Sequence, residues 1–374
     1  MKFKYYMPTR IVFGTNSFDS IGELVAEGFP EVKRVMIVTG KRAMRKLGYV
    51  DRLKQQLKSH TTSLFEGVEP NPSTETIQKG VESVRKEETE LVIGLGGGSA
   101  MDTAKIMAVL KNNPGHVEEY LLGKRNISNE ALPYIAVPTT AGTASEVTPY
   151  AVTTFGKEKK TLDHEFMYPK TAVIDPKLTV HLPKEQTAST GLDALSHAVE
   201  AFWAKRHNDV SDIFALEAIR LVFEFLPKAC SNPENIDYRA SMCKASLYAG
   251  LAFSQTRTTA AHSVSYPLTL NFGIPHGIAC ALTLASFLEF NAEVMAQRAV
   301  VLAGAMNART PREAANNIRR LMKAVGVATR LRDYGLKESD VGTIIKEGFT
   351  PSRIANNPAE ITEEQLRKML MDIF

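Results

Sequence analysis

The sequence predicts two domains: an α/β domain with a parallel sheet over residues 1–183, and an all-helical domain over residues 184–374. Up to Pro183, short apolar runs alternate with amphipathic stretches, and this alternation implies parallel strands joined by crossover helices. After Pro183 the strand-like runs disappear, and apolar positions recur at helical spacing. A length of 374 residues suits two domains, each with its own core.

Three apolar runs in the first half have the length and the flanking turn residues of buried strands. They are RVMIVTG, ending at Gly40, LVIGLGGG, ending at Gly98, and PYIAVPTT, ending at Thr140. Between them, YVDRLKQQLKSH and STETIQKGVESVRKEETE repeat apolar positions at helical spacing, and Ser73 is placed to cap the second helix. A strand-rich insert, VTPYAVTTFGKEKKTLDHEFMYPKTAVIDP, completes this half.

The second half reads as a series of helices broken at proline, glycine and asparagine. SDIFALEAIRLVFEFLPKAC, DYRASMCKASLYAGLAFSQ and TPREAANNIRRLMKAVG are all helical in period. An earlier helix pattern, STGLDALSHAVEAFWAK at residues 189–205, carries Asp193 and His197 four residues apart. Both side chains therefore lie on one helical face.

Composition excludes several classes of function. The formal net charge is only +4 and the basic residues are scattered, so no nucleic-acid partner is expected. No apolar run reaches membrane length and the N-terminal segment lacks the apolar core of a signal peptide, so we expect a cytoplasmic protein without membrane contact. Cys230, Cys243 and Cys280 are far apart, which favours buried thiols over disulfides or a thiolate zinc site.

The stretch LVIGLGGGSAMDTAK is the best nucleotide-binding signal. It places the glycines 96–98 and Ser99 where a strand turns into a helix, so backbone N–H groups and the helix N-terminus can hold a phosphate. The spacing matches neither the G-x-G-x-x-G pattern nor a P-loop. The alternative is a tight turn with a capping box from Ser99 to Asp102 and no ligand.

A loop rich in hydroxyl groups, PTTAGTASEVT at residues 138–148, is a second candidate for cofactor contact. It follows a predicted strand, and open α/β sheets bind ligands at the carboxyl ends of their strands. The alternative is a solvated Ser/Thr loop.

Two histidines of the second half add to the helix pair. His262 lies in TTAAHSVSYPL and His276 in FGIPHGIAC. With the pair they provide one carboxylate oxygen and three imidazole nitrogens, a set that suits Fe(II) or Zn(II) and is poor for Mg(II) or Ca(II). Spacing alone leaves two alternatives without a metal. Asp193 and His197 can form an ion pair on the helix surface, and His276 can be an ordinary turn residue after Pro275.

Five motifs occur in the order found in one known family. They are EPNPS (69–73), GGGSAMDTAK (96–105), PTTAGTASEVT (138–148), TGLDALSHAVEAF (190–202) and GIPHG (273–277). With them the chain resembles the iron-containing (group III) alcohol dehydrogenases over nearly its whole length. The resemblance implies a dehydroquinate synthase-like fold, with a Rossmann-like dinucleotide-binding domain, a helical domain and a metal in the cleft between them.

The same resemblance implies the residues of the site. The metal ligands fall on Asp193, His197, His262 and His276, and the ion is usually iron and sometimes zinc in relatives. The implied cofactor contacts are Asn71, Gly97, Gly98, Ser99, Asp102, Thr139, Thr140, Thr143 and Lys160. The resemblance also implies a small alcohol or aldehyde as substrate and, as in many relatives, a homodimer.

The turn after the second predicted strand departs from relatives that use NAD. Those relatives tend to carry an acidic residue there for the ribose hydroxyls, whereas this chain has Gly40, Lys41 and Arg42. An acid repels a 2′-phosphate, and a small residue followed by cations accepts one. We therefore expect NADP(H) to be favoured over NAD(H), the alternative being a basic loop without a ligand.

Tyr266 is a second departure, because many relatives have a histidine there that is assigned to proton relay. A phenol, with an ordinary pKa near 10, is a poorer relay at neutral pH. Tyr266 is thus either a tentative catalytic residue or part of the substrate wall. The surrounding TAAHSVSYPLT also resembles a branch with phosphonoacetaldehyde reductases, which implies an anionic aldehyde and a cation such as Arg257 to meet it.

The reaction expected on these grounds is reversible hydride transfer between NADP(H) and a small primary alcohol or its aldehyde, with the metal as Lewis acid. A lyase or cyclase of the dehydroquinate-synthase kind is one rival, and the Asp-x-x-x-His pair counts against it. A non-catalytic nucleotide-binding protein is the other, and the complete ligand set counts against that.

Overall fold

The computed structural model describes residues 2–374, which form two compact units. The α/β unit comprises Met7–Thr140 and Ala144–Thr179. The helical unit comprises Val180–Phe374 together with residues 2–6 and Ala141–Thr143. The sequence predicted one domain boundary, after residue 183, and so assigned both short segments to the α/β domain. They are too short to show a helical period that would have assigned them to the helical unit.

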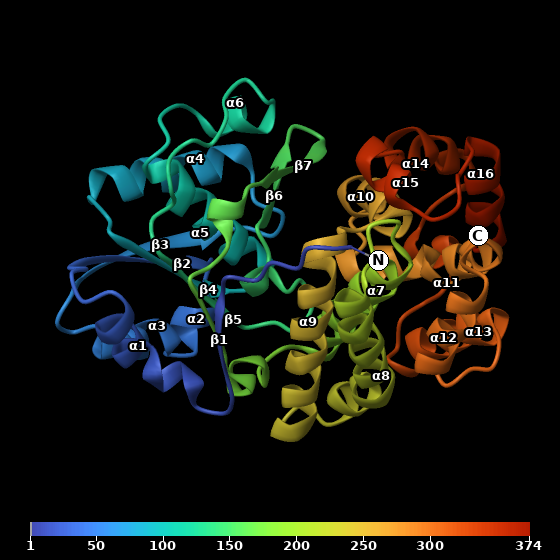
Figure 1. Ribbon diagram of the computed structural model, residues 1–374, viewed down its shortest axis with the longest axis horizontal. Helices are drawn as coiled ribbons and strands as arrows, with labels where there is room; N and C mark the ends of the chain where they lie inside the picture. The colour runs from blue at the N-terminus through green and yellow to red at the C-terminus, as the bar shows by residue number, and fades with distance from the viewer. Residues whose placement is uncertain (1) are drawn as a thin grey trace. The chain divides into compact units, whose positions relative to one another are not determined.

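A six-stranded sheet forms the centre of the α/β unit, and its neighbouring strands are all parallel (Figure 1). The strand order is β1-β8-β5-β4-β2-β3. The bounds are β1 Arg10–Phe13, β2 Arg34–Gly40, β3 Thr61–Val68, β4 Leu91–Gly96, β5 Tyr134–Pro138 and β8 Thr171–Ile174. The prediction of a parallel sheet from alternating strands and helices is therefore confirmed.

Helices cover both faces of this sheet, so its strands are apolar on both sides. Met36 and Val38 of β2 pack in a core with α4 and α5, while Val35 and Ile37 pack in a second core with α1 and α3. The helices of the unit are α1 Ile21–Gly28, α2 Ala43–Lys46, α3 Tyr49–Gln56, α4 Thr74–Lys86, α5 Gly98–Lys111 and α6 Val117–Leu121.

Two local predictions in this unit have different outcomes. Ser73 does cap α4, because its side chain accepts a hydrogen bond from the backbone N–H of Thr76. The alternative of a capping box from Ser99 to Asp102 is wrong, because α5 begins two residues earlier than that box requires, with Gly97 as its N-cap. The strand-rich insert forms an antiparallel hairpin, β6 Tyr150–Phe155 and β7 Glu158–Asp163, followed by β8.

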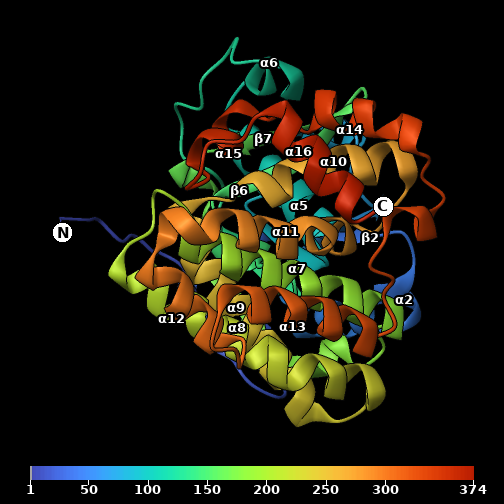
Figure 2. The same ribbon diagram turned by 90° about the vertical axis from the view of Figure 1, so that its right-hand side faces the viewer.

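From residue 184 on, the described residues of the helical unit contain ten α-helices and no strand (Figure 2). Their bounds are α7 Lys184–Trp203, α8 Asp209–Ser231, α9 Ile236–Thr256, α10 Ala260–Phe272, α11 His276–Met295, α12 Gln297–Ala305, α13 Pro311–Ala324, α14 Val341–Gly348, α15 Pro351–Asn356 and α16 Glu363–Asp372. The prediction of an all-helical second half is therefore confirmed. Helix α7 is buried along most of its length and packs against α8, α9 and α11.

Two sequence expectations about this unit need adjustment. Helix α7 begins five residues before the predicted Ser189, because Pro183 provides its N-cap position. The expectation that no apolar run reaches membrane length is also too strong, because α11 is long and apolar enough, with a mean hydropathy of 1.4. However, 67% of that stretch is buried inside the protein, as in the core helix of a globular domain.

Candidate metal centre and cofactor cradle

Helix α7 brings Asp193 and His197 together one turn apart, with 3.8 Å between Oδ1 of Asp193 and Nδ1 of His197. Both side chains are buried. The N-terminus of α11 approaches this helix closely at Gly277, where an added Cβ would lie 1.9 Å from the backbone oxygen of Ser189. Glycine at position 277 is therefore needed for α11 to bring His276 to the same place.

The other two predicted ligands converge on the same carboxylate oxygen. Nε2 of His262, from α10, lies 3.6 Å from Oδ1 of Asp193, and Nε2 of His276 lies 3.8 Å from it. The ring centroids of His197 and His262 are 4.3 Å apart. The structure thus gathers all four predicted ligands from three helices around one oxygen atom.

The chemistry of this cluster fits a divalent cation. Within residues 2–374, three of its buried atoms have no hydrogen-bond partner, namely Oδ1 of Asp193, Nδ1 of His197 and Nε2 of His262. Leaving such atoms unsatisfied in the interior is costly. One ion held between them would satisfy all three, which neither a surface ion pair nor a turn histidine explains.

Electrostatics keep Asp193 and His197 in the form that a cation needs. Burial alone would raise the pKa of Asp193, but the neighbouring imidazoles, His197 foremost, hold it well below its usual range. Burial lowers the pKa of His197 to about 4. Near pH 7 the cluster therefore contains a carboxylate and a neutral imidazole with a lone pair to offer.

Cys280 joins the cluster, which the sequence did not predict. Ligand atoms of Asp193, His262, His276 and Cys280 all lie within 4.8 Å of one another. The Sγ atom is 3.9 Å from both ring nitrogens of His276, one helical turn before it. His197 lies at the margin of this group, with its ring stacked on Phe253 at 4.1 Å. The three cysteines are buried free thiols, as expected.

Glu200 is the most important residue that sequence reasoning missed. Its Oε2 lies against Nδ1 of His262, and its Oε1 accepts hydrogen bonds from the Thr259 hydroxyl at 2.7 Å and the Ala261 N–H at 2.8 Å. Trp203 donates its indole N–H to the Thr259 oxygen at 2.8 Å, so the Thr259 proton must point to Glu200.

These hydrogen bonds fix the orientation of one ligand imidazole. Because Oε2 of Glu200 accepts from Nδ1 of His262, the opposite nitrogen, Nε2, is left with its lone pair facing Asp193. A signal for this was present in the sequence. Glu200 follows His197 by three residues and so lies on nearly the same face of the helix.

Tyr266 lies beside the cluster, with its ring centroid 6.0 Å from that of His276. The guanidinium of Arg353 sits over the Tyr266 ring, 4.7 Å from its centroid. The same arginine donates from Nε to the Thr258 hydroxyl at 3.2 Å. Arg257, the cation suggested by the sequence, is exposed and has a left-handed φ of 64°.

In the α/β unit, several predicted cofactor residues surround the start of α5. The Ser99 hydroxyl accepts a hydrogen bond from the Asn71 N–H at 3.2 Å, and the Thr139 N–H donates to the Gly96 oxygen at 3.0 Å. A Cβ at position 97 would meet the Thr140 side chain at 3.3 Å. The glycine turn, Ser99 and the two threonines thus form one cradle at the positive end of a 14-residue helix.

Other predicted cofactor residues are placed differently. Asp102 has both carboxylate oxygens engaged, with the Ser145 hydroxyl at 2.5 Å and the Val152 N–H at 2.9 Å, which ties α5 to β6 and to the loop before it. Lys160 on β7 pairs with Glu158 at 2.7 Å. Thr143 belongs to the short segment that groups with the helical unit.

The basic turn stands at the carboxyl end of β2. Lys41 and Arg42 are exposed, and an added Cβ at Gly40 would meet only the Val68 oxygen, at an ordinary 3.6 Å. The turn therefore has room for a side chain at position 40.

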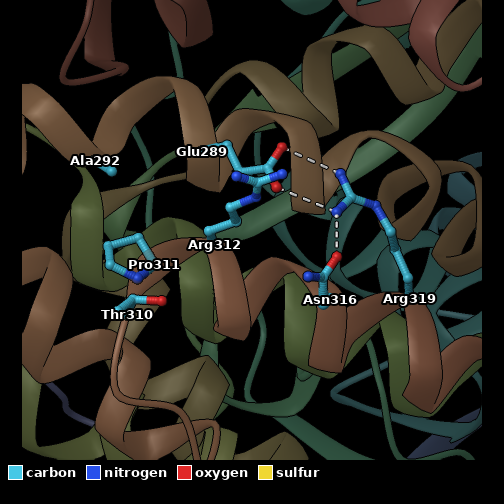
Figure 3. A pocket seen from close by; sticks show the side chains of 7 residues that line it. All are labelled: Glu289, Ala292, Thr310, Pro311, Arg312, Asn316 and Arg319. Carbon is cyan, nitrogen blue, oxygen red and sulfur yellow. Dashed lines mark hydrogen bonds and ion pairs between the residues drawn. The ribbon is translucent and has the colours of Figure 1, made fainter.

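An open pocket elsewhere in the helical unit carries none of the predicted site residues (Figure 3). Seven residues of α11, α13 and the turn before α13 line it, and its central contact is the pairing of Arg319 with Glu289 and Asn316. That pairing joins the charges of Arg319 and Glu289, and none of the predicted metal ligands or cofactor contacts lines the pocket.

Comparison with known proteins identifies the class. A model described as iron-containing alcohol dehydrogenase matches residues 8–176, and one for the C-terminal part of that family matches residues 187–374. A glycine turn at a helix N-terminus on an α/β unit and a buried Asp/His cluster on a helical unit are features expected of a metal-dependent, NAD(P)-linked oxidoreductase. The chain belongs to the iron-containing alcohol dehydrogenase family.

Named relatives extend over nearly the whole chain. Long-chain-alcohol dehydrogenase 1 of Geobacillus thermodenitrificans is 33% identical, covering 96% of this chain and 95% of its own. NADPH-dependent butanol dehydrogenase of Clostridium saccharobutylicum is 31% identical, covering 99% and 98%. The solved structure of sulfoacetaldehyde reductase from Bifidobacterium kashiwanohense, in complex with NAD+, superposes with a TM-score of 0.94 at 35% identity, covering 100% and 99%. Family and fold therefore agree with the sequence predictions, and they favour hydride transfer over the lyase rival.

Proposed function

We propose that the protein transfers hydride reversibly between NADP(H) and a small primary alcohol or its aldehyde, at a divalent ion held by the cluster around Asp193. The convergence of the four side chains, with three buried ligand atoms otherwise unsatisfied, carries the proposal. We propose iron or zinc as the ion, since the ligand set suits both.

The residues of the cluster divide into ion ligands, a residue that orients one ligand, and a residue that lines the substrate site. Asp193, His197, His262 and His276 hold the ion, and Glu200 keeps Nε2 of His262 available by occupying Nδ1. When bound, the ion supplies Lewis-acid polarisation of the substrate oxygen, and the nicotinamide supplies or accepts the hydride. Tyr266 forms part of the substrate wall beside His276.

The cradle of the α/β unit has the task of holding the cofactor. In the proposal the pyrophosphate sits on Gly97, Gly98 and Ser99 at the start of α5, where N–H groups and the helix dipole favour negative charge. Contacts to the adenosine and ribose are proposed for Thr139, Thr140 and Thr143, and further cofactor contacts for Asn71 and Lys160. Asp102 acts indirectly, by fixing α5 to the loop that follows the cradle.

A panel of small alcohols and aldehydes, assayed with both cofactors, tests the proposed function. The protein is first stripped of metal and then reloaded separately with Fe(II) and Zn(II). We expect turnover that depends on the added ion, with the absorbance of the reduced nicotinamide changing in proportion to product. Product formation without that change would favour the lyase, and no turnover with any pair would contradict the proposal.

Preference for NADP(H) can be tested by one substitution at the end of β2. Gly40→Asp places a carboxylate where the structure has room for it, and a carboxylate repels the 2′-phosphate. We expect the ratio of kcat/KM for NADPH over NADH to exceed one in the parent protein and to fall about 10- to 100-fold in the variant. Gly40→Ala is the matched control for added volume. A parent protein that prefers NADH would contradict this part of the proposal.

An anionic aldehyde is the second candidate substrate. The sulfoacetaldehyde reductase structure is the specific observation that favours it, and the resemblance of TAAHSVSYPLT to phosphonoacetaldehyde reductases points the same way. A homodimer in the cytoplasm remains the expected setting, and sedimentation of the purified protein tests the assembly.

A further inference from the structure

We infer that Cys280 is an additional ligand of the ion, through its thiolate, and that this sulfur makes the centre prefer zinc to iron. The inference rests on the proposed function, which leaves both ions open, and adds to it a ligand and a metal preference. The family resemblance implied only one carboxylate and three imidazoles at this site. The wide spacing of the cysteines argues against a site built from several thiolates, but not against one thiolate beside histidines.

Helix α11 places Cys280 one turn after His276, so both side chains lie on the same helical face. The arrangement repeats that of Asp193 and His197, four residues apart on α7. The two helices approach closely at Gly277, where an added Cβ would lie 2.8 Å from Cβ of Asp193. Each helix therefore contributes a pair of side chains that can bind a metal, and the two pairs lie side by side.

The sulfur lies at nearly the distance from its neighbours that ligands of one ion have from each other. Sγ of Cys280 is 3.9 Å from Nε2 of His276, which is 3.8 Å from Oδ1 of Asp193. The same oxygen is 3.6 Å from Nε2 of His262. Metal–ligand distances of about 2.0–2.3 Å place the ligand atoms of a tetrahedral ion about 3.3–3.6 Å apart. A small contraction of this group would therefore let it hold one ion.

Two buried atoms of the same group indicate a ligand independently of the cysteine. Within residues 2–374, Oδ1 of Asp193 and Nε2 of His262 have no hydrogen-bond partner, and both side chains are only 4% exposed. Ligand atoms of these two residues, His276 and Cys280 all lie within 4.8 Å of one another. A cation in this space would satisfy the oxygen and the nitrogen, whereas a thiol that only fills space would leave both unsatisfied.

A thiolate changes which ion the centre favours. A thiol that coordinates a divalent ion is deprotonated, so the Cys280 proton passes to solvent as the sulfur–metal bond forms. Because Cys280 is fully buried, its thiolate would be costly without the ion, which links deprotonation to metal binding. Thiolate is a soft ligand that favours zinc, whereas carboxylate and imidazole alone suit iron(II) as well. The sulfur should therefore contribute more to the affinity for zinc than to that for iron(II).

X-ray absorption of the zinc-loaded protein tests the sulfur ligand directly. The parent should show a sulfur neighbour at about 2.3 Å, in addition to nitrogen and oxygen neighbours at about 2.0–2.2 Å. In Cys280→Ser and Cys280→Ala the sulfur neighbour should disappear while zinc remains bound. Cys230→Ser, which changes another buried cysteine near the end of α8, is the matched control and should keep the sulfur neighbour.

Affinity measurements test the metal preference. Competition with a chelator should give a zinc Kd at least about 10-fold higher in Cys280→Ala than in the parent, since even groups that only orient a ligand contribute that much. The Kd for iron(II) should rise less. Cys280→Ser keeps nearly the volume of the side chain, so it separates loss of the sulfur from the cavity left by alanine. Full zinc affinity in Cys280→Ser would assign Cys280 to packing.

The outcomes also separate this inference from the proposed function. A zinc-loaded parent with only nitrogen and oxygen neighbours, or a sulfur neighbour that persists in Cys280→Ser, would overturn the inference while the dehydrogenase function stands. Equal losses of zinc and iron(II) affinity in Cys280→Ala would overturn the metal preference. A parent protein that binds neither zinc nor iron(II) would instead remove the proposed metal centre, and the proposed function with it.

Discussion

The cofactor cradle and the metal cluster are built in opposite ways. The cradle depends on backbone groups from a continuous stretch, the end of β4 and the start of α5, with help from the loop after β5. The cluster depends on side chains from α7, α10 and α11, which are 83 residues apart from Asp193 to His276. A local site of the first kind tolerates single substitutions, because each N–H contributes little. A site assembled over long distances should fail when one member is removed.

The largest effect expected from this contrast is that of His262→Ala. The variant removes one ligand and leaves Asp193 and Glu200 buried without their partner. We expect loss of bound metal and a fall in kcat/KM of about three orders of magnitude or more, while the circular dichroism spectrum is retained. Metal analysis after gel filtration measures the first, and steady-state kinetics the second.

His60→Ala is the matched histidine control, because His60 lies in the α/β unit and its ring contacts the neighbouring Ser59. It should keep both metal and turnover. If His262→Ala retained its metal and its full activity, the cluster would not be the metal centre.

The next largest effect tests whether a residue that is not itself a ligand contributes to metal affinity. Glu200→Gln keeps the shape of the side chain but removes the charge that accepts from Nδ1 of His262. We expect metal affinity to fall about 10- to 100-fold, as for other groups that orient a ligand histidine. Competition with a chromophoric chelator measures it.

Trp203 provides a second readout, since it is the one tryptophan in the sequence and reaches Glu200 through Thr259. Metal loading should change its fluorescence in the parent protein and change it less in Glu200→Gln. Glu217→Gln, which removes an exposed carboxylate paired with Arg220, is the control. Equal metal affinity in the parent and Glu200→Gln would assign Glu200 to packing alone.

The same contrast explains what could be predicted from the sequence. The parallel sheet, the Ser73 cap and the glycine turn are confirmed because they depend on neighbours in the chain, where residue type and spacing act directly. The capping box at Ser99 was wrong because Gly97 already provides the N-cap position, and Ser99 instead accepts from Asn71. That competing partner lies 28 residues away and leaves no periodic signal.

The convergence of the metal cluster could not be predicted from the spacing of its residues in the sequence. Asp193 and His197 could be paired from their helix, but His262 and His276 could be added only through resemblance to a family. The positions of Glu200 and Cys280 at the cluster were missed because they depend on the packing of α10 and α11 against α7. Side-chain convergence of this kind is a property of the tertiary structure, to which local pattern gives no access.

The smallest expected effect is on the stability of the α/β unit, and it concerns Glu146 in the loop that follows β5. Glu146, in the loop after β5, is buried, and its Oε2 has no hydrogen-bond partner within residues 2–374. Burial raises its pKa to about 7, above the ordinary value of 4.5, although the nearby Lys105 opposes the shift. The folded state therefore binds more protons than the unfolded state between about pH 4.5 and 7. The stability that this group contributes is fully present below that window and is lost as the pH rises through it.

Glu146→Gln removes this titration and should flatten the pH dependence of stability. We expect the melting temperature of the variant, relative to the parent, to be about 2–4 °C higher at pH 8 than at pH 5. Burial lowers the pKa of Lys105 to about 8, although Asp102 and Glu146 oppose the shift, so the comparison is repeated at pH 7, where Lys105 is mostly protonated in the parent. A difference in melting temperature that stays constant from pH 5 to 8 would mean that the Glu146 carboxylate is paired in the folded protein. The loop after β5 would then be joined to α5 by a Glu146–Lys105 ion pair rather than hold a buried carboxylic acid.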